Sequence, residues 1–413
     1  MSAIFDPAGQ AQLQRLPRLL YIGDVPVEDS YHGSALLYRL LQTYPRERLF
    51  IVEGSLLASQ IKRRLAGARY AALPVGSNRL LHTRLSTLYS SWLTLTTVNR
   101  TSQIDRLCRS FEAAAVLTVA HGYIWTTAAR FAAERGLPLH LICHDDHPRV
   151  ADVITFMTEK LDARFASVYR QATSRLCISP YMRDAYRKRY KADGTVLYPS
   201  RRADCPVYQE PPYRLYEVPD GLTVAFGGTI NSTGYLRALK SLARILEVIK
   251  GRLLIFGPVR SADVRDKGLD RSNIELRGLL DSRELIRQFR NEADVLFVPM
   301  SFDAAHRTNM EIGFPSKLAD YTAVGIPLLI YGPEYSSAVR WARQNPGVAE
   351  VVSEENTRQL EKAIHGLAAN PARRVGLGAR ALEAGRYFGF ETAQEIFYRA
   401  LLAGASEPAD QVL

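Results

Sequence analysis

Residues 311–327 read EIGFPSKLADYTAVGIP and predict a short helix with a breaker at each end. Pro315 suits the first helical turn, and Gly325 suits the C-terminal cap. The backbone amides near Ser316 and Lys317 would point out of the positive end of this helix, which makes that end a candidate phosphate site. Because Lys317 carries a full charge of its own, it would strengthen phosphate binding there.

Asp320 follows Lys317 by three residues, so the two side chains would share one helix face, about 5 Å apart along the axis. A nucleotide separates its diphosphate from its ribose hydroxyls by a similar length, and a carboxylate accepts hydrogen bonds from both hydroxyls. A solvated Lys–Asp pair on a packed helix has the same spacing. The pattern alone leaves both interpretations open.

Strand-like apolar runs alternate with helical stretches on both sides of this segment, which predicts an α/β fold with doubly wound parallel sheets. The runs include RLLYIGD, RLFIVEG, AAVLTVAHG and PLHLICHDD in the first half, and LTVAFGGTI, GRLLIFGPV, DVLFVPM and PLLIYGP in the second.

The chain of 413 residues is long enough for two domains. Residues 205–221 are rich in Pro and Tyr and lack periodicity, so we interpret them as a linker. This places one α/β domain at 1–205 and another at 206–390. Two such domains imply a cleft between them, and small ligands usually bind at the carboxyl ends of parallel strands.

The positive charge is unevenly distributed. Residues 1–205 contain 28 Lys and Arg against 17 Asp and Glu, whereas residues 206–413 contain 25 of each, so the first half accounts for the whole net charge of +11. This favours an anionic partner for the first half, such as a phospholipid surface, a lipid-diphosphate acceptor or nucleic acid. Arg187, Lys188 and Arg189 are candidate membrane contacts. A solvated basic face is the alternative.

Several classes of protein are excluded by what the sequence lacks. No run of about 18 apolar residues could form a membrane-spanning helix. The first residues lack a signal-peptide pattern, and the four cysteines lack zinc-site spacing. Neither hydrolase nor P-loop motifs occur. We therefore expect a cytoplasmic protein, with the inner face of the plasma membrane as a candidate site of peripheral attachment.

The segment FPSKLADYTAVGIP resembles the nucleotide-sugar signature of GT-B glycosyltransferases, especially the retaining family-four group. FGGTINSTGYLRALKSLARIL resembles the unit that opens their donor domain, and TSRLCISPYMRDAYRKRY resembles the last unit of their acceptor domain. The resemblance covers most of the chain. It implies two Rossmann-like domains facing across a cleft, with acceptor bound by the first, donor by the second, and residues 391–413 crossing back to the first domain.

The resemblance also implies roles for single residues. Members of the family often carry two Glu residues with seven residues between them. The second matches Asp320, which would contact the ribose, and the first falls at Ile312, so Glu311 beside it is the candidate sugar contact. Thr229 stands where many relatives carry a basic residue that holds the diphosphate. We expect Lys317 to hold it here, and Arg237, Arg260 and Arg307 are the other candidates.

The full predicted donor site extends to both domains. Small residues near the strand ends would let backbone amides approach the diphosphate. The predicted contacts are Gly33, Ser34, Gly228, Thr229, Gly257, Gly278, Ser316, Lys317, Leu318 and Asp320.

Two histidines follow predicted strands and are candidate catalytic residues. His144 matches the family's His–Asp position, which lies near the donor sugar in its relatives, and His121 follows the preceding strand. An imidazole there could bind a sugar hydroxyl or manage the acceptor proton. Loop or capping roles are the alternatives. Residues 144–147, HDDH, also suit a divalent ion, but GT-B enzymes handle phosphate charge with helix ends and basic side chains, so we expect no metal and no cofactor.

The predicted function is transfer of a hexose from a UDP-, GDP- or dTDP-sugar to a glycan, lipid-linked or small-molecule acceptor, in cell-envelope polysaccharide or glycolipid synthesis. The resemblance implies retention at the anomeric carbon. An anionic membrane surface is a further candidate partner, and nucleic acid is not expected. The alternatives are a sugar-nucleotide epimerase and a non-catalytic nucleotide-sugar-binding subunit.

Overall fold

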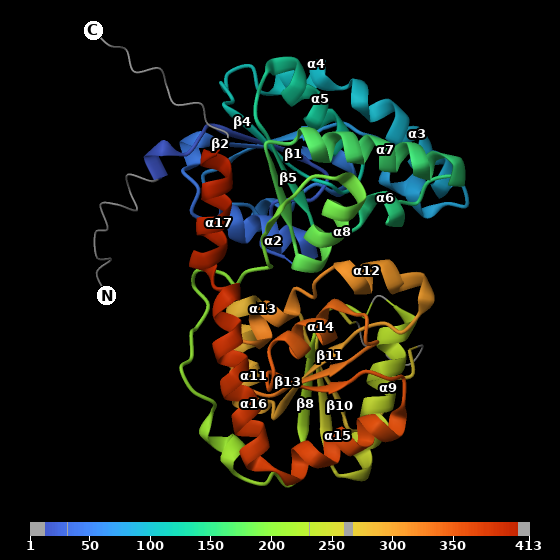
Figure 1. Ribbon diagram of the computed structural model, residues 1–413, viewed down its shortest axis with the longest axis vertical. Coiled ribbons are helices and arrows are strands. Elements are labelled where there is room, and N and C mark those ends of the chain that lie inside the picture. The colour runs from blue at the N-terminus through green and yellow to red at the C-terminus, as the bar shows by residue number, and fades with distance from the viewer. Residues whose placement is uncertain (1–12, 31, 231, 260–266, 404–413) are drawn as a thin grey trace. The chain divides into compact units, whose positions relative to one another are not determined.

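The computed structural model describes residues 13–30, 32–230, 232–259 and 267–403 and divides the chain into two compact units (Figure 1). Unit 1 comprises Met1–Leu197 with Glu391–Leu413, and unit 2 comprises Tyr198–Phe390. The division falls before the predicted boundary at 205/206 because Tyr198 packs against Phe314 and Phe388 of unit 2, with ring centroids 4.9 and 5.2 Å away.

Unit 1 contains a seven-stranded parallel sheet in the order β3-β2-β1-β4-β5-β6-β7. The winding reverses between β1 and β4, and ligands usually bind at such a switch point. The strands are β1 (Leu19–Gly23), β2 (Leu49–Gly54), β3 (Arg69–Leu73), β4 (Ala115–Val119), β5 (Leu139–Cys143), β6 (Ser174–Cys177) and β7 (Thr195–Val196). The helices are α2 (His32–Leu41), α3 (Ser86–Thr96), α4 (Thr101–Leu107), α5 (Trp125–Arg135), α6 (His147–Val150), α7 (Thr155–Gln171), α8 (Pro180–Tyr190) and α17 (Phe390–Leu402).

Unit 2 contains a six-stranded parallel sheet in the order β10-β9-β8-β11-β12-β13, with its switch point between β8 and β11. The strands are β8 (Thr223–Gly227), β9 (Arg252–Phe256), β10 (Ile274–Gly278), β11 (Val295–Pro299), β12 (Leu328–Tyr331) and β13 (Ala349–Val352). The helices are α9 (Thr233–Val248), α11 (Ser282–Glu292), α12 (Arg307–Ile312), α13 (Lys317–Tyr321), α14 (Ser337–Gln344), α15 (Thr357–Ala369) and α16 (Pro371–Ala384).

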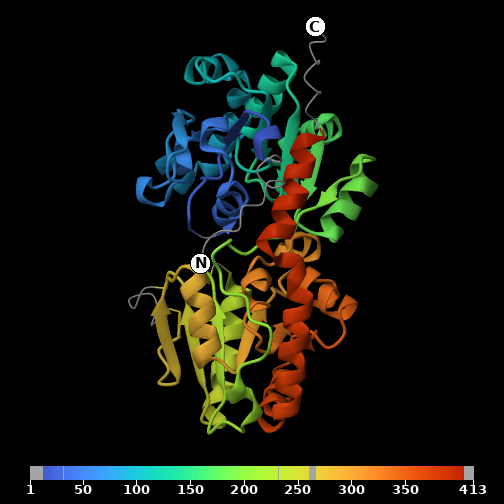
Figure 2. The ribbon, with the colours of Figure 1, turned by 90° about the vertical axis from the view of Figure 1, so that its left-hand side faces the viewer.

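The predicted α/β class is confirmed by these two sheets. Central strands such as β1, LLYIG, are buried along their whole length, because helices cover both faces of a doubly wound sheet. In unit 2, α9 and α15 cover one face, and α11 and α16 cover the other (Figures 1 and 2). The apolar side of α9 packs against β8 and β9 in one continuous core through Leu239, Leu242 and Leu246. Within the described ranges, no helix combines the length and the apolar character needed to cross a bilayer.

The C-terminal helix α17 belongs to unit 1 from Glu391 onward. Its Tyr398 is buried, and the phenol oxygen lies 3.1 Å from the Thr43 hydroxyl. The same ring packs edge-on against Tyr44, with centroids 5.9 Å apart. These aromatic and polar contacts, far apart in sequence, attach the last described helix to the first part of the chain.

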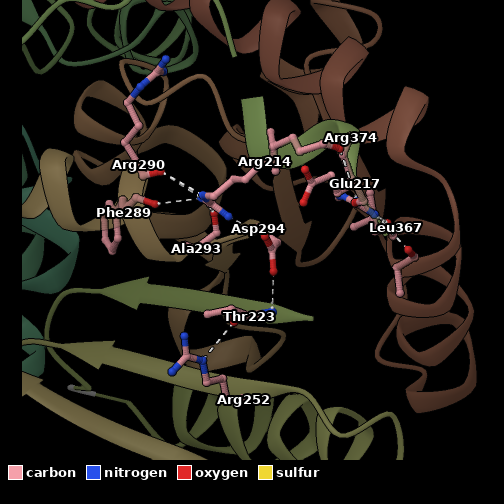
Figure 3. Close-up of polar contacts among 12 residues, drawn as sticks. Arg214, Glu217, Thr223, Arg252, Phe289, Arg290, Ala293, Asp294, Leu367 and Arg374 are labelled. Atoms are coloured by element: carbon pink, nitrogen blue, oxygen red, sulfur yellow. Dashed lines mark hydrogen bonds and ion pairs between the residues drawn. The ribbon is translucent and has the colours of Figure 1, made fainter. Parts of the chain in front are cut away.

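The predicted linker, residues 205–221, forms part of unit 2 and packs against α11 and β8 (Figure 3). Arg214 pairs with Asp294 at 2.5 Å and donates to the carbonyls of Arg290 and Ala293 at the end of α11. A guanidinium there satisfies carbonyls that have no partner within the helix. Asp294 in turn accepts the Thr223 N–H at 2.8 Å, so one ion pair connects the linker, α11 and the start of β8.

Asp294→Ala should therefore destabilise unit 2 by about 2–4 kcal/mol, because the Arg214 charge and the Thr223 N–H both lose their partner. We expect faster native-state hydrogen exchange of the β8 amides, a readout that does not require the two units to unfold together. The control is Glu275→Ala, which breaks half-exposed pairs with Arg252 and Arg277 and should change stability by less than about 1 kcal/mol. Equal effects would contradict the structural role of Asp294.

Candidate active site

Three glycines lie side by side at the carboxyl ends of β8, β9 and β10. The Gly228 N–H donates to the Phe256 carbonyl and the Gly257 N–H donates to the Gly278 carbonyl, both at 2.8 Å. A Cβ on Gly257 would overlap the Gly228 carbonyl oxygen, and Gly228 has a φ of +141°, so neither position accepts a side chain without strain. The structure thus brings together three of the predicted donor-site glycines and leaves their backbone open to close approach.

We call Gly228, Gly257 and Gly278 the glycine floor. After Gly228 the chain continues into α9, which begins at Thr233 with Ser232 as its N-cap. The Ser232 hydroxyl accepts the Tyr235 N–H at 3.1 Å. A strand, a glycine turn and the positive end of a long helix form an arrangement suited to phosphate. The predicted Thr229 lies in this turn and is half-buried.

Lys317 of α13 reaches the same floor. Its amine lies 4.5 Å from the ring centroid of Phe226 and 5.1 Å from that of Tyr235, and 3.6 Å from the point where a Cβ on Gly228 would stand. Burial lowers the pKa of the Lys317 amine to about 7. The two ring faces act in the opposite direction, because they favour the ammonium form. A phosphate bound at Gly228 would also favour that form.

The other candidate phosphate ligands have different partners. Arg237 pairs with Asp303 at 2.5 Å and with Glu355 at 3.3 Å. Arg307 approaches the Glu311 carboxylate at 4.0 Å and stacks over Tyr335. Arg260 lies outside the described residues.

Within the part of the chain that the structure describes, no carboxylate pairs with the Lys317 amine. Of the described candidates, Lys317 is thus the cation best placed to receive a phosphate. The predicted Glu311 has other neighbours: its carboxylate lies 4.0 Å from Arg307, and its carbonyl accepts from Arg340 at 3.4 Å.

The predicted helix at 315–325 is shorter than expected. α13 comprises only Lys317–Tyr321, and tighter turns continue to Gly325, which ends the segment with a φ of +76°. Ser316 is exposed at the start. Leu318 is fully buried and its N–H donates to the Pro315 carbonyl at 3.0 Å, so Leu318 serves packing here.

Asp320 and Lys317 have different neighbours, although they share one short helix. The buried Asp320 carboxylate lies 3.4 Å from the Ser282 hydroxyl at the start of α11, whereas Lys317 faces the start of α9. The next residue, Tyr321, was missed by sequence reasoning. Its hydroxyl accepts the Gly227 N–H at 2.6 Å and donates to the Gly227 carbonyl, so it fixes the end of β8. A tyrosine within an otherwise buried segment was the available signal, because a buried hydroxyl requires a partner.

In unit 1, two histidines and an aspartate meet at the carboxyl ends of β4 and β5. His144 Nε2 lies 3.3 Å from both His121 Nδ1 and Asp145 Oδ2, and the His121 and Asp145 atoms are 3.7 Å apart. His121 and Asp145 are about two-fifths exposed, at 39% and 40%. The predicted Gly33 adjoins this cluster, because a Cβ there would lie 2.6 Å from His144 Cε1. Ser34 follows in the first turn of α2.

The HDDH segment divides into two pairs with different surroundings. Burial alone would raise the pKa of Asp145, but the hydrogen bond to His121 and the charges of the neighbouring histidines lower it to about 2. Asp146 is fully buried and pairs with Arg189 at 2.9 Å. His147 is buried against Trp125, and that burial lowers its pKa to about 3. His144 and Asp145 thus belong to the candidate site, whereas Asp146 and His147 are buried and contact other residues of the unit 1 interior.

His121, His144 and Asp145 also form the donor set that could hold a metal ion, since their ligand atoms all lie within 4.8 Å of one another. Two imidazoles and a carboxylate suit a divalent transition metal such as zinc, with one coordination position left open. The expected absence of a metal stays a prediction.

Asp24 is a further residue that sequence reasoning missed. It follows β1, is buried, and accepts the N–H groups of Tyr123 and Ile124 at 2.5 and 2.8 Å. Burial raises the pKa of its carboxyl group. Asp24 therefore holds the turn that carries His121 into α5. Its place directly after a buried strand was the signal for it.

The low pKa of Lys317 predicts a pH-dependent stability. Between about pH 7 and the ordinary lysine pKa of 10.5, the unfolded chain binds more protons than the folded one at this residue, so its contribution to stability rises with pH. Lys317→Met should raise the melting temperature most at pH 7 and below, and the gain should shrink toward pH 10. Exposed Lys362→Met is the control. A gain independent of pH would contradict the burial of a titrating amine.

No protein-family model matches the chain, and no curated protein does. Solved structures do match. Sucrose-phosphate synthase from Thermosynechococcus elongatus is 14% identical, with a TM-score of 0.64 and 93% of this chain and 99% of that chain covered. Anabaena HepE in complex with UDP and glucose is 11% identical, with a TM-score of 0.65 and the same coverage. The trehalose-6-phosphate protein from E. coli bound with UDP-2-fluoro glucose is 12% identical, with a TM-score of 0.63 and again 93% and 99% covered. The chain therefore has the two-domain GT-B fold of glycosyltransferases.

Proposed function

We propose that the protein is a glycosyltransferase whose unit 2 binds a nucleotide-diphosphate sugar. The observation that carries this proposal is the half-buried Lys317 amine above the glycine floor at Gly228, with no carboxylate partner among the described residues. A half-buried cation near the positive end of a helix is stabilised by an anion, and a diphosphate supplies one. The presence of UDP with glucose in HepE supports this choice of ligand.

In the proposed reaction, the bond between the donor sugar and the diphosphate breaks as the acceptor oxygen bonds to the sugar. Lys317 stabilises the negative charge that develops on the leaving diphosphate. The amides at the start of α9 assist it, and they are already oriented before the donor binds. We propose that the Asp320 carboxylate accepts hydrogen bonds from the ribose hydroxyls. The Ser282 hydroxyl, 3.4 Å away, holds this carboxylate in place. The base is proposed to be uracil, on the evidence of the structural neighbours that hold UDP.

We assign the acceptor to unit 1, where His144 and His121 would bind a sugar hydroxyl or take up the acceptor proton. Asp145, ionised because its pKa is about 2, would hold the histidines in place. Transfer of a hexose with retention is proposed from the family resemblance, and NMR of the anomeric proton in the product would test it. The proposed acceptor is a glycan or lipid-linked sugar of the cell envelope, reached from the cytoplasmic side.

Lys317→Met should weaken UDP binding by at least about tenfold, because a charge-assisted bond to phosphate is lost. Affinity of the wild type should fall as the pH rises above about 7, since only the ammonium form binds phosphate well, and the variant should lose this dependence. Titration calorimetry with UDP, GDP and dTDP measures both effects. Unchanged affinity in a folded Lys317→Met variant would remove Lys317 from the site.

The same calorimetry can separate the contribution of the diphosphate to binding from that of the ribose. Asp320→Ala should weaken UDP binding but leave inorganic diphosphate binding intact, because diphosphate has no ribose. Lys317→Met should weaken both. Lys362→Met, on the exposed side of α15, should change neither.

His144→Ala should lower transfer by about 10- to 1000-fold while UDP affinity barely changes, the range expected for a positioned acid–base or polar group. UDP release measured with and without glycan and lipid-linked acceptors provides the assay. His365→Ala, a half-exposed histidine of α15, should retain full activity. Full activity of His144→Ala would return that residue to a loop role.

The same assay distinguishes the other interpretations. Conversion of the donor sugar without an acceptor would indicate an epimerase, and binding without turnover would indicate a non-catalytic subunit. Activity that is unchanged by a chelator would support the metal-free mechanism, whereas loss that zinc restores would assign a metal to His121, His144 and Asp145.

A further inference from the structure

Helix α3 presents an apolar stripe to solvent and buries a side on which most residues are polar. Leu88, Trp92 and Leu95 are 58%, 51% and 53% exposed, whereas Ser90, Ser91 and Thr94 are buried together with a single leucine, Leu93. Leu85, just before the helix, is 63% exposed and continues the apolar stripe at the spacing of a helix face. A surface helix that only packs on a core has the reverse arrangement.

Hydrogen bonds hold α3 in this orientation. The Ser90 hydroxyl lies 2.8 Å from the Tyr123 hydroxyl, and the Ser91 hydroxyl accepts the Ile154 N–H at 3.0 Å. Thr87, in the first turn, donates to Asp152 at 2.7 Å. Rotation of α3 about its axis would break these hydrogen bonds. The bonds therefore fix the orientation in which the apolar stripe faces solvent. Figure 1 shows α3 at the outer margin of unit 1, beside α7.

The apolar stripe lies in a stretch that has positive charge and no negative charge. Residues 54–104 contain no Asp or Glu and seven basic residues, which are Lys62, Arg63, Arg64, Arg69, Arg79, Arg84 and Arg100. Arg79 and Arg84 immediately precede α3 and are exposed, and in the described part of the chain neither pairs with a carboxylate. Exposed apolar side chains also gather here, since seven of the 16 large ones among the described residues lie between Leu57 and Leu95.

We propose that this α3 surface, formed by Leu85, Leu88, Trp92 and Leu95 with Arg79 and Arg84, docks on a membrane of anionic phospholipid. Apolar side chains including a tryptophan, next to unpaired arginines in a stretch of chain without Asp or Glu, match the interface between acyl chains and negative headgroups. An acidic residue from outside this stretch, Asp152, contacts α3 itself, where it accepts from Thr87. A protein partner would match the apolar stripe but would not require a stretch free of acidic residues. The inference is independent of the proposed donor site in unit 2.

The structure disfavours the membrane contact predicted from sequence on α8. Arg189 pairs with the buried Asp146, and Arg187 lies 3.6 Å from Asp184. Tyr186 and Tyr190, the aromatic residues between these arginines, are buried. The basic residues of α8 are thus partly engaged within unit 1, and α8 offers no exposed apolar face of its own to a bilayer.

Sedimentation of the full chain with vesicles tests the proposal. We expect at least about tenfold stronger binding to vesicles of phosphatidylcholine mixed with phosphatidylglycerol than to phosphatidylcholine alone, and weaker binding at high salt. Leu88→Ser with Trp92→Ser should reduce binding about tenfold. Arg79→Glu with Arg84→Glu should do the same and flatten the salt dependence.

Two matched controls should retain full vesicle binding. Val248→Ser with Leu279→Ser removes exposed apolar residues from unit 2, and Lys188→Glu reverses a charge on α8. Melting curves and UDP affinity should be unchanged in all these variants, which separates loss of docking from loss of folding or of the donor site.

Three outcomes would overturn the proposal. The first is equal binding to neutral and anionic vesicles, and the second is full vesicle binding by the Leu88→Ser, Trp92→Ser variant. The third is a dimer that forms without lipid and that the same two substitutions convert to monomer. The dimer, measured by analytical ultracentrifugation, would assign the α3 surface to a second copy of the chain.

Discussion

The close approach of Gly257 to the Gly228 carbonyl is the constraint on which the unit 2 site depends. Because no side chain fits between these residues, the carboxyl ends of three strands come together as bare backbone. Tyr321 fixes the end of β8 beside these glycines through both backbone polar groups of Gly227. The Lys317 amine then lies above a surface of amides and aromatic rings, where no acidic residue of the described chain neutralises it.

This arrangement opposes stability and favours binding. A half-buried amine whose pKa falls to about 7 lowers the stability of the folded chain at neutral pH, since the unfolded chain holds the proton more tightly. A bound anion reverses the sign, because it favours the ammonium form. Under the proposed function, stability and donor binding are linked through a single proton on Lys317, and the bound diphosphate would make this otherwise unfavourable group favourable.

Unit 1 uses buried polar groups in a different way. Asp24 and Asp146 are both buried and both have partners: one carboxylate oxygen of Asp24 accepts two backbone amides, and Asp146 pairs with Arg189. They fix the turns after β4 and β5, and so the histidines at the strand ends hold their positions near Asp145. On the outer side of the same unit, α3 uses serine and threonine hydroxyls to orient a helix whose apolar face has no partner in the described chain.

Local pattern was enough to predict the α/β class, the residues that follow each strand and the glycines at 228, 257 and 278. Strands buried on both faces of a parallel sheet are continuous apolar runs, and a glycine at such a strand end is visible in the sequence. The same pattern placed His121, His144 and Lys317 at strand ends or at a helix start. It also gave Gly325 as the end of the short helix, although the α-helical part proved to be only five residues long.

The tertiary structure alone decided which of these side chains are free to act. Arg237 was another candidate for the diphosphate beside the favoured Lys317, but in the fold it pairs with Asp303 and Glu355, which are distant in sequence. Asp145 and Asp146 are adjacent in the chain, yet Arg189 on α8 pairs only with Asp146, which is buried. Ion pairs and burial form between residues that the chain brings together only on folding, so a local pattern can name the chemical groups but cannot tell which of them the fold leaves for a ligand.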